Sequence, residues 1–550
     1  MSQDKCSTVN PRHWQIVVPF ALFVVHALLF RSWINDDAGI SFAYARSLIH
    51  GCGLVSQCGV EPVEGFSNPL WTLLISPVFA GNPADPTLAI KLVSLALVFG
   101  TFVMVDRSFQ CLFGRTLWWP AATVAVCALL SLNTSFVVWT TSGLENCLYA
   151  LLMAWYSLVM LEYAVDEMPR PNHLPIWAGV AAAGLALTRP DGVVFLGAFP
   201  ALLASAVLIR PSRAKSAARD LVTFLTAAGL PVALYVCFRY TYFGDVYPNT
   251  YYAKGGPSVA QALALLLLRK QYIIKTYDLL DGVLSWRASW VSVLLFALFR
   301  YRLARSHKPL VIVSLALPLV FSWAVYCLLP DDWMREYRFA TPFFLTLYVF
   351  VTGLLAEVLS EADKPSFRGR WLAFLLAAAL LLMQSAKLYL PRSARFSVRP
   401  EVPFSHVAVA YGLAFNSYAT ELRISNASLL CPDLGGTLYY SEHRVYDLAG
   451  LCDRTIARLI RQRDSQALRD YILEELKPTF IHVHDRWSVS TGIYGDPRFR
   501  ELYATIKEVP SEWAQAQGYS GAYSGDYVRK DAVPLPEDLD RLRVQLRSRS

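Results

Sequence analysis

A series of long apolar runs constrains the fold of this chain more than any other feature. Most of these runs approach the ~17–25 residues that an α-helix needs to cross a bilayer. They lie at residues 14–31, 87–105, 117–133, 144–162, 174–188, 192–209, 221–238, 284–299, 309–329, 339–357 and 371–390. Charged residues make up only 17% of the chain, against roughly 25% in ordinary soluble domains. The sequence therefore predicts a polytopic α-helical membrane protein with about eleven transmembrane helices.

Two apolar segments need separate treatment. The stretch NPLWTLLISPVFAG, residues 68–81, is too short to span and is expected to form a half-inserted or interfacial helix. The first run, residues 14–31, is followed by further spans and by no small-residue cleavage site. We therefore expect it to remain as a membrane anchor, because a removed signal peptide would carry such a site.

Lysine and arginine gather in alternate loops between the predicted spans. Such loops are expected on the cytoplasmic side of the membrane. Together with the segment before the first span they contain Lys5 and Arg12; Arg107 and Arg115; Arg170; Arg210, Arg213, Lys215 and Arg219; Arg300, Arg302, Arg305 and Lys308; and Lys364, Arg368 and Arg370. An odd number of spans then predicts that residues 391–550 lie on the opposite, external side.

The C-terminal region has a different composition from the rest of the chain. It alternates short apolar runs such as SLLCP and TFIHVH with helical patterns such as DRTIARLIRQ. This pattern is typical of a soluble α/β domain. We therefore expect two domains, a transmembrane domain at residues 1–390 and an external α/β domain at residues 391–550.

Four cysteines fall on the external side in this topology. Cys52 and Cys58 lie in the first external loop, and Cys431 and Cys452 lie in the external domain. An oxidising compartment would allow two disulfides, one within each pair. The alternative is that each cysteine is an unpaired small hydrophobic residue. No cysteine or histidine spacing indicates a zinc site, so no metal site is predicted.

Two adjacent acidic residues, Asp36 and Asp37, follow the first apolar run in the sequence WINDDAGISFAYARSLIHG. A single acid at this point would mark the water boundary of a helix. Two adjacent carboxylates repel each other, so one pKa rises or a cation lies nearby. A carboxyl group with a raised pKa suits a general base. We therefore predict that Asp36 and Asp37 are catalytic.

The other external loops also carry polar and aromatic residues. Carboxylates, amides and tyrosines bind sugar hydroxyls and ring faces, and cations bind phosphate. The predicted sugar or acceptor ligands are Glu64, Asn68, Glu145, Arg189, Asn249 and Tyr252, and the predicted phosphate ligands are Lys254, Arg335 and Arg338. Together they predict a lipid-phosphate-linked sugar as the substrate. The alternative for each cation is anchoring to lipid headgroups.

Two substrate classes are excluded by what the sequence lacks. No glycine-rich phosphate loop follows a predicted strand, which argues against a nucleotide-sugar donor. No basic surface interleaved with aromatic residues is present, so no nucleic acid is expected as a partner.

A set of motifs resembles one family of bacterial membrane glycosyltransferases. They are DDAGISFAYARSLIHGCGLV, VEGFSNPLWTLL, SGLENCLYALL, ALTRPDGVV, YFGDVYPNTYYAK, DWMREYRFATP and RVYDLAGLCDRTIAR, in this order. The family has the GT-C fold and includes the mycobacterial terminal arabinofuranosyltransferase AftB. The motifs span residues 36 to about 458. The cysteine-bearing insertion GCGLVSQCGVEP departs from the family's pattern.

The resemblance implies an activity and a location. The donor would be a polyprenyl-phosphate-linked sugar, with D-arabinofuranose as the expected sugar. The acceptor would be an envelope polysaccharide, a lipoglycan or a pilin on the periplasmic face of the bacterial inner membrane. The family's essential aspartate maps onto Asp36 or Asp37, and we favour Asp36 because it leads the motif.

Other functions remain open at this point. A mannosyl or aminoarabinosyl transferase would share the fold, and a non-catalytic envelope or flagellar assembly factor would tolerate substitution of Asp36. A secondary transporter is disfavoured, because no internal repeat is present. A divalent cation is not required, although Asp36, Asp37 and Glu64 could hold one.

Overall fold

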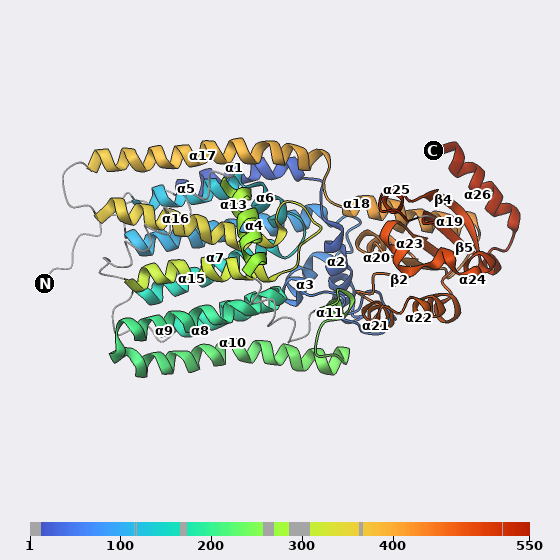
Figure 1. Cartoon of the computed structure of the whole chain (residues 1–550), viewed down its shortest axis with the longest axis horizontal. Helices are drawn as coiled ribbons and strands as arrows, with labels where there is room; N and C mark the ends of the chain where they lie inside the picture. Colours follow the sequence, from blue (N-terminus) through green and yellow to red (C-terminus); the bar gives the residue numbers. More distant parts are fainter. Residues whose placement is uncertain are drawn as a thin grey trace.

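The protein divides into a helical bundle and a C-terminal domain at one end of it (Figure 1). The computed structural model describes residues 13–114, 116, 118–165, 173–256, 269–284, 309–361, 367–519 and 521–549. Apolar helices of the bundle run alongside one another, and their buried side chains form one large hydrophobic core. This arrangement is that of a polytopic helical membrane protein, as predicted.

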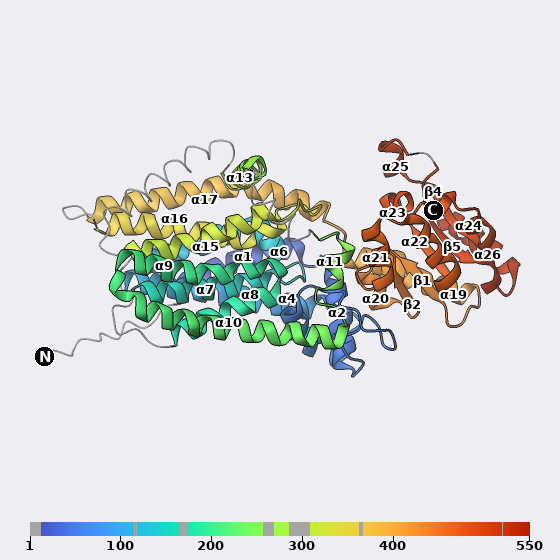
Figure 2. The ribbon, with the colours of Figure 1, turned by 60° about the horizontal axis from the view of Figure 1, so that its bottom comes forward.

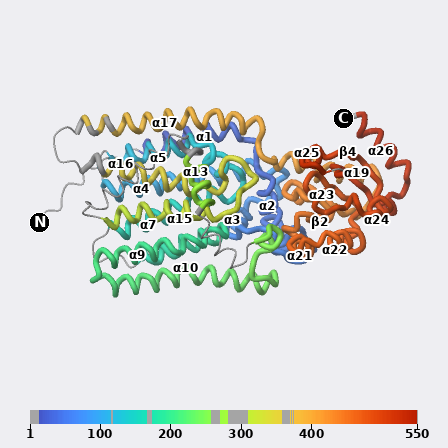
Figure 3. Tube along the Cα trace, viewed as in Figure 1, coloured from blue at the N-terminus to red at the C-terminus, as the bar shows by residue number. Residues whose placement is uncertain are grey.

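The bundle is built from long and short helices. They are α1 (Trp14–Ala27), η1 (Leu28–Phe30), α4 (Thr87–Phe113), α5 (Trp118–Leu132), α6 (Thr134–Thr140), α7 (Asn146–Val165), α8 (Leu174–Thr188), η3 (Pro190–Gly197), α9 (Ala198–Ile209), η4 (Pro211–Arg213), α10 (Ala214–Phe243), α13 (Arg269–Leu284), α15 (Pro309–Leu328), η5 (Arg338–Ala340), α16 (Thr341–Glu361) and α17 (Phe367–Val398). Figure 3 follows this path, with α17 running along the edge of the bundle to the C-terminal domain.

Fewer helices than expected are long enough to span a membrane. Among the described residues, seven helices have the necessary length and apolar character, or eight if the bent pair α5 and α6 forms one span. The predicted spans at 14–31 and 174–188 form shorter apolar helices. The predicted span at 284–299 lies almost wholly outside the described residues. The described part of the chain therefore supports seven or eight of the eleven predicted spans.

A layer of short helices lies between the bundle and the C-terminal domain. It contains α2 (Asp36–Ile49), α3 (Pro69–Ile75), η2 (Ser76–Phe79), α11 (Asn249–Ala253) and α18 (Phe404–Val407). The segment expected to be half-inserted, residues 68–81, forms α3 and η2 of this layer. Figure 2 shows α2 and α11 at the junction, where α10 reaches the end of the bundle.

The C-terminal domain is a mixed α/β structure, as the sequence predicts. Its five strands are β1 (Ser428–Cys431), β2 (Arg444–Asp447), β3 (Phe480–Val483), β4 (Tyr503–Pro510) and β5 (Tyr523–Arg529). They form one sheet in the order β2-β1-β3-β5-β4. β1 pairs in parallel with β2 and β3, and β5 runs antiparallel to β3 and β4.

Helices surround this sheet. They are η6 (Ala408–Leu413), α19 (Ala414–Glu421), α20 (Gly435–Tyr440), α21 (Arg454–Gln462), α22 (Ser465–Asp470), η7 (Tyr471–Leu476), α23 (Asp485–Thr491), η8 (Ile493–Gly495), α24 (Pro497–Leu502), α25 (Glu512–Ala516), η9 (Lys530–Ala532) and α26 (Pro536–Arg549). Two separate groups of buried apolar residues pack on the strands, one around Phe415 and Phe480 and one around Ile472 and Phe499. The boundary expected at residue 390 falls inside α17, which continues to Val398.

Candidate active site

The two adjacent aspartates begin helix α2. Asn35 caps the helix, because its side-chain oxygen accepts a hydrogen bond from the backbone amide of Asp37 at 3.1 Å. Acidic residues in the first turn also interact favourably with the helix dipole. Successive residues of a helix point in different directions, so Asp36 and Asp37 meet different surroundings.

Asp36 is buried against the C-terminal domain. Its two carboxylate oxygens accept hydrogen bonds from the backbone amides of Gly435 and Gly436, at 3.0 and 2.7 Å. These amides open helix α20, and a Cβ atom at Gly435 would lie only 1.8 Å from the Asp36 carbonyl oxygen. Burial raises the pKa of Asp36 well above its usual value, against the effect of the two amides, and the charges of Asp433 and Asp37 raise it further. Asp36 therefore joins α2 to the C-terminal domain.

Asp37 turns towards the bundle instead. Its side chain is 34% exposed, and its Oδ2 atom lies 3.7 Å from Nη1 of Arg338. The other terminal nitrogen of Arg338 lies 3.9 Å from Oε1 of Glu145. One guanidinium group thus lies between two carboxylates. Of the two adjacent aspartates, Asp37 is the one with both a cationic partner and access to solvent.

Glu145 is the buried centre of this group. Oε2 accepts a hydrogen bond from the side-chain amide of Asn68 at 2.8 Å, and Nη1 of Arg189 lies 3.8 Å from Oε1. Burial acts to raise the pKa of Glu145, but Arg338 and Arg189 outweigh it and the pKa lies below its usual value. Glu145 is therefore held as a carboxylate. We call Asp37, Asn68, Glu145, Arg189 and Arg338 the arginine–carboxylate cluster.

The two arginines of the cluster keep unused hydrogen-bonding capacity. Arg189 donates from Nε to Asp191 at 2.9 Å, and its guanidinium packs over the rings of Tyr149 and Phe339. Nη1 of Arg189 and Nε of Arg338 are buried and have no hydrogen-bond partner among the described residues. Buried donors are normally paired, so each of these two atoms could still donate a hydrogen bond to a ligand oxygen.

A cavity of about 410 Å³ opens beside Arg338. Its lining carries five cationic and three acidic side chains: Lys275, Arg335, Arg338, Arg392, Arg395, Asp331, Asp332 and Glu336. Three of these cations are paired with other carboxylates, Arg392 with Glu336 at 2.9 Å, Lys275 with Asp331 at 3.3 Å, and Arg335 with Glu401. The excess of positive charge suits an anionic ligand.

The structure does not bring the remaining predicted residues to the cluster. Glu64 accepts hydrogen bonds from Tyr235 at 2.7 Å and from Nε of Arg239 at 2.5 Å. Burial raises the pKa of Glu64, and the contacts with Arg239 and Tyr235 only partly oppose this. The side chain of Asn249 donates to the carbonyls of Gly450 and Leu451, at 2.7 and 2.9 Å. These contacts join the loops of the bundle to one another and to the C-terminal domain.

Two further predicted ligands lie on helix α11 or at its end. The ring of Tyr252 packs against the guanidinium of Arg461, 5.3 Å from its centroid. Lys254 ends the helix and is exposed. The carboxylates considered for a divalent cation are engaged separately, Asp36 by amides and Glu64 by Arg239. The described part of the chain contains no cluster of three or more histidine, cysteine or acidic residues arranged to hold a metal ion.

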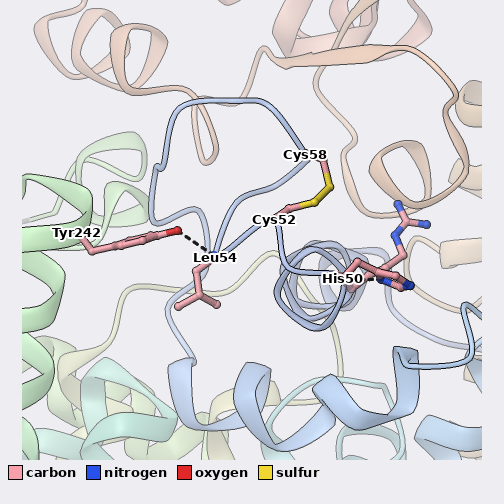
Figure 4. Close-up of a disulfide and its surroundings, with 6 residues drawn as sticks. His50, Cys52, Leu54, Cys58 and Tyr242 are labelled. Atoms are coloured by element: carbon pink, nitrogen blue, oxygen red, sulfur yellow. Dashed lines mark hydrogen bonds between the residues drawn. A yellow bond between two sulfur atoms is a disulfide. The ribbon is translucent and has the colours of Figure 1, made fainter.

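The four cysteines that were predicted to be external form one disulfide. Cys52 and Cys58 are joined, with their Cα atoms 5.3 Å apart, in the loop that follows α2 (Figure 4). The loop is held on its other side by a hydrogen bond from the Leu54 amide to the Tyr242 hydroxyl, at 3.0 Å. Cys431 and Cys452 are both free thiols, so the second possible disulfide is not formed. Cys431 is buried in strand β1 and packs with the apolar core, as the alternative interpretation predicted.

Some residues of the site were not predicted. Asp191 lies two residues after Arg189 in TRPDG and forms an ion pair with it at 2.9 Å. Their opposite charges and closeness in sequence could have indicated this pair. Arg392 and Arg395 directly follow the predicted span 371–390. Lys275 lies in α13, where no helix was predicted. The sequence carries no signal that would place these cations beside Arg338.

The chain is similar to known proteins at three levels. Residues 408–533 match a domain of unknown function, DUF8728. A terminal beta-(1->2)-arabinofuranosyltransferase from Mycobacterium tuberculosis is 28% identical over 250 residues. That match covers 41% of this chain and only 35% of the relative's length.

Solved structures resemble the chain over nearly its whole length. ArnT from Cupriavidus metallidurans bound to undecaprenyl phosphate has a TM-score of 0.53 and 12% identity, covering 95% of this chain and 100% of its own. The oligosaccharyltransferase AglB from Archaeoglobus fulgidus, in complex with an inhibitory peptide and a dolichol-phosphate, has a TM-score of 0.50 and 11% identity, covering 95% and 75%.

The chain has the GT-C fold. This confirms the predicted fold class, a polytopic helical membrane protein with a mixed α/β domain at its C-terminal end. Within this GT-C fold the arginine–carboxylate cluster is built from the start of α2, from the residues that directly precede α3, α7 and η3, and from η5.

Proposed function

We propose that this protein is a membrane glycosyltransferase that uses a polyprenyl-phosphate-linked sugar as its donor. One observation carries the proposal. Asp37, a carboxylate with access to solvent, lies 3.7 Å from Arg338, which also lines a cavity rich in cations. A carboxylate beside a phosphate-binding surface is what transfer of a sugar from a lipid phosphate requires.

The donor phosphate binds in the cavity beside Arg338. Guanidinium groups bind phosphate in a bidentate way, and Arg338, Arg335 and Arg395 all line this space. ArnT, which shares the fold, binds undecaprenyl phosphate. D-Arabinofuranose is the proposed sugar, because the relative from Mycobacterium tuberculosis is an arabinofuranosyltransferase. Lys254 was predicted as a further phosphate ligand and remains a candidate only through its place in the resembling motif.

In the reaction an acceptor hydroxyl attacks the anomeric carbon of the sugar, and the polyprenyl phosphate leaves. If the configuration inverts, Asp37 takes the hydroxyl proton. If it is retained, Asp37 stabilises the oxocarbenium-like carbon and the leaving phosphate takes the hydroxyl proton. Arg338 lies close enough to stabilise the negative charge that develops on the leaving phosphate. Glu145, Asn68 and Arg189 keep Arg338 in place or bind sugar hydroxyls.

Asp36 has a different role in this proposal. Both of its oxygens are occupied by backbone amides, so it is a positioning residue that fixes α2 and hence the direction of Asp37. Glu64 and Asn249 support the loops around the site in the same way. The acceptor is an envelope polysaccharide, a lipoglycan or a pilin, and the reaction takes place on the periplasmic face of the bacterial inner membrane.

The test uses the purified full chain in nanodiscs with polyprenyl phosphates carrying arabinofuranose, mannose or aminoarabinose. Asp37→Asn should lower sugar transfer or donor hydrolysis by about 10²–10⁴-fold, the usual contribution of a general acid or base. Asp85→Asn, in an exposed loop, is the matched control and should retain full turnover.

The result also separates the alternatives. Turnover only with mannose or aminoarabinose would replace arabinofuranose as the sugar. Full activity of Asp37→Asn would reject the catalytic role of Asp37. Failure of every donor either to stabilise the protein or to react would favour the non-catalytic assembly factor.

A further inference from the structure

A second cavity, of about 470 Å³, lies at the far end of α2 from Asp37. Four parts of the chain form its walls: the end of α2, the disulfide-closed loop, Asn82, and residues 441–444, which lead into strand β2. Its volume falls within the ~300–1,000 Å³ of ordinary ligand sites. Figure 4 shows His50 beside the disulfide at this end of the helix.

The walls are fixed to each other by specific contacts. β2 is an edge strand of the sheet, and the side chain of Gln57 bonds to its free edge in the manner of a peptide group. Gln57 accepts from the Val445 amide at 2.8 Å and donates to the His443 carbonyl at 2.9 Å. Arg46 donates to the carbonyls of Tyr439 and Leu438 at the end of α20, at 2.8 and 3.2 Å. The cavity is therefore a built feature of the domain junction.

Most side chains of the lining are polar, and they carry more positive than negative charge. It contains the guanidinium groups of Arg46 and Arg444 against the single carboxylate of Glu442. Arg444 is exposed and stacks on Tyr446, with its guanidinium carbon 5.2 Å from the ring centroid. Nε2 of His443 is buried without a hydrogen-bond partner among the described residues. These groups suit a ligand with many hydroxyls and a negative charge.

We infer that this cavity binds an anionic part of the glycan acceptor, such as a uronate or a phosphate-substituted sugar, away from the point of transfer. The inference rests on the proposed function. Helix α2 connects the two places, and its 14 residues rise by about 20 Å at ~1.5 Å per residue. A single sugar cannot reach from the cavity to Asp37, so an acceptor that occupies both places carries several sugar units.

Binding is tested without any donor, by fluorescence anisotropy on the full chain in detergent. The probes are labelled oligogalacturonate of about ten units and a neutral maltodextrin of equal length. We expect tighter binding of oligogalacturonate, and Arg444→Glu should weaken it by about tenfold, as when one charge-assisted hydrogen bond is lost. His443→Gln, a second variant at the cavity wall, should weaken it in the same direction.

The matched control is Arg541→Glu on α26, where Arg541 is 64% exposed and forms an ion pair along its own helix with Asp538. It should bind the probe as the wild type does. The inference is overturned if oligogalacturonate does not bind saturably, or if Arg444→Glu and His443→Gln both leave its binding unchanged. It is also overturned if maltodextrin and oligogalacturonate bind equally while dihexanoyl phosphatidylglycerol competes for the site, because the cavity would then bind a lipid headgroup. Donor turnover is measured in parallel, so that the acceptor-binding inference and the proposed transferase activity are tested separately. Sugar transfer can fail while glycan binding persists, and glycan binding can fail while sugar transfer persists.

Discussion

Two arginine–carboxylate groups lie where the bundle meets the C-terminal domain, and they differ in how completely they are satisfied. In the first, Arg338 lies 3.7 Å from Asp37 and 3.9 Å from Glu145, distances too long for hydrogen bonds. In the second, Arg239 and Glu64 are in direct hydrogen-bond contact, with Glu64 also bonded to Tyr235.

The difference indicates which group has room for a ligand. The buried Nε of Arg338 has no partner among the described residues, and the same side chain lines a cavity. Nε and Nη2 of Arg239 both contact Glu64, and Nη1 donates to the Val246 carbonyl. A satisfied buried pair serves structure, whereas loosely held charges beside a cavity are available for binding.

Of the substitutions that test this comparison, Arg338→Lys is expected to lower sugar transfer the most. A lysine keeps the positive charge but lacks the planar fork that contacts two carboxylates and a phosphate together. We expect sugar transfer to fall by about 10²-fold, the size seen when one preorganised donor is lost. The thermal midpoint should change little, because Arg189 and Asn68 still hold Glu145. Turnover at saturating donor and a thermal melt measure the two effects.

Arg239→Lys applies the same substitution to the satisfied group. It removes part of the hydrogen bonding to Glu64, whose side chain is 1% exposed. We expect the free energy of unfolding to fall by about 1–3 kcal/mol, with turnover per folded molecule unchanged within about twofold. Thermal unfolding in detergent and active-site titration measure these quantities. If Arg239→Lys stopped transfer without lowering stability, the Glu64 group would have to be counted as part of the active site.

The sequence predicted the pieces of the cluster but not which pieces meet. Asp37, Asn68, Glu145, Arg189 and Arg338 were all chosen from loops predicted to be external, because charged and amide groups next to apolar runs are costly unless they have a function. Glu64 and Asn249 satisfied the same criterion. Their partners, Arg239 and the carbonyls around Gly450, become visible only when the chain is folded.

Long-range contacts set the same limit for the two aspartates. We favoured Asp36 as the catalytic residue because it leads the motif. The sequence could not show that Asp36 is buried, because its burial depends on Gly435 and Gly436, about 400 residues away in sequence. Fewer of the predicted spans are confirmed than were expected, because some of the apolar helices are short. Residues 174–188, for example, form a helix of only 15 residues. Apolar composition thus predicted the fold class, while the division of roles within the site needed the tertiary structure.

Asp36→Asn tests the division between the two aspartates through pH. Burial raises the pKa of Asp36 in the folded protein, so the folded state holds its proton more tightly than the unfolded state does. The stability contributed by Asp36 is then fully present below the unfolded-state pKa of about 3.9. It is lost as the pH rises through the raised folded-state pKa.

Asparagine has nearly the same shape and does not titrate. Between pH 4 and pH 8 the stability of wild type relative to Asp36→Asn should therefore decrease. Thermal midpoints of the two proteins, measured side by side at each pH, isolate Asp36 because the other ionisable groups are the same in both proteins. A relative stability of wild type that rises with pH would mean that the amides of Gly435 and Gly436 outweigh burial. Asp36 would then be a fixed anion next to Asp37, and its charge would have to be included in the chemistry of transfer.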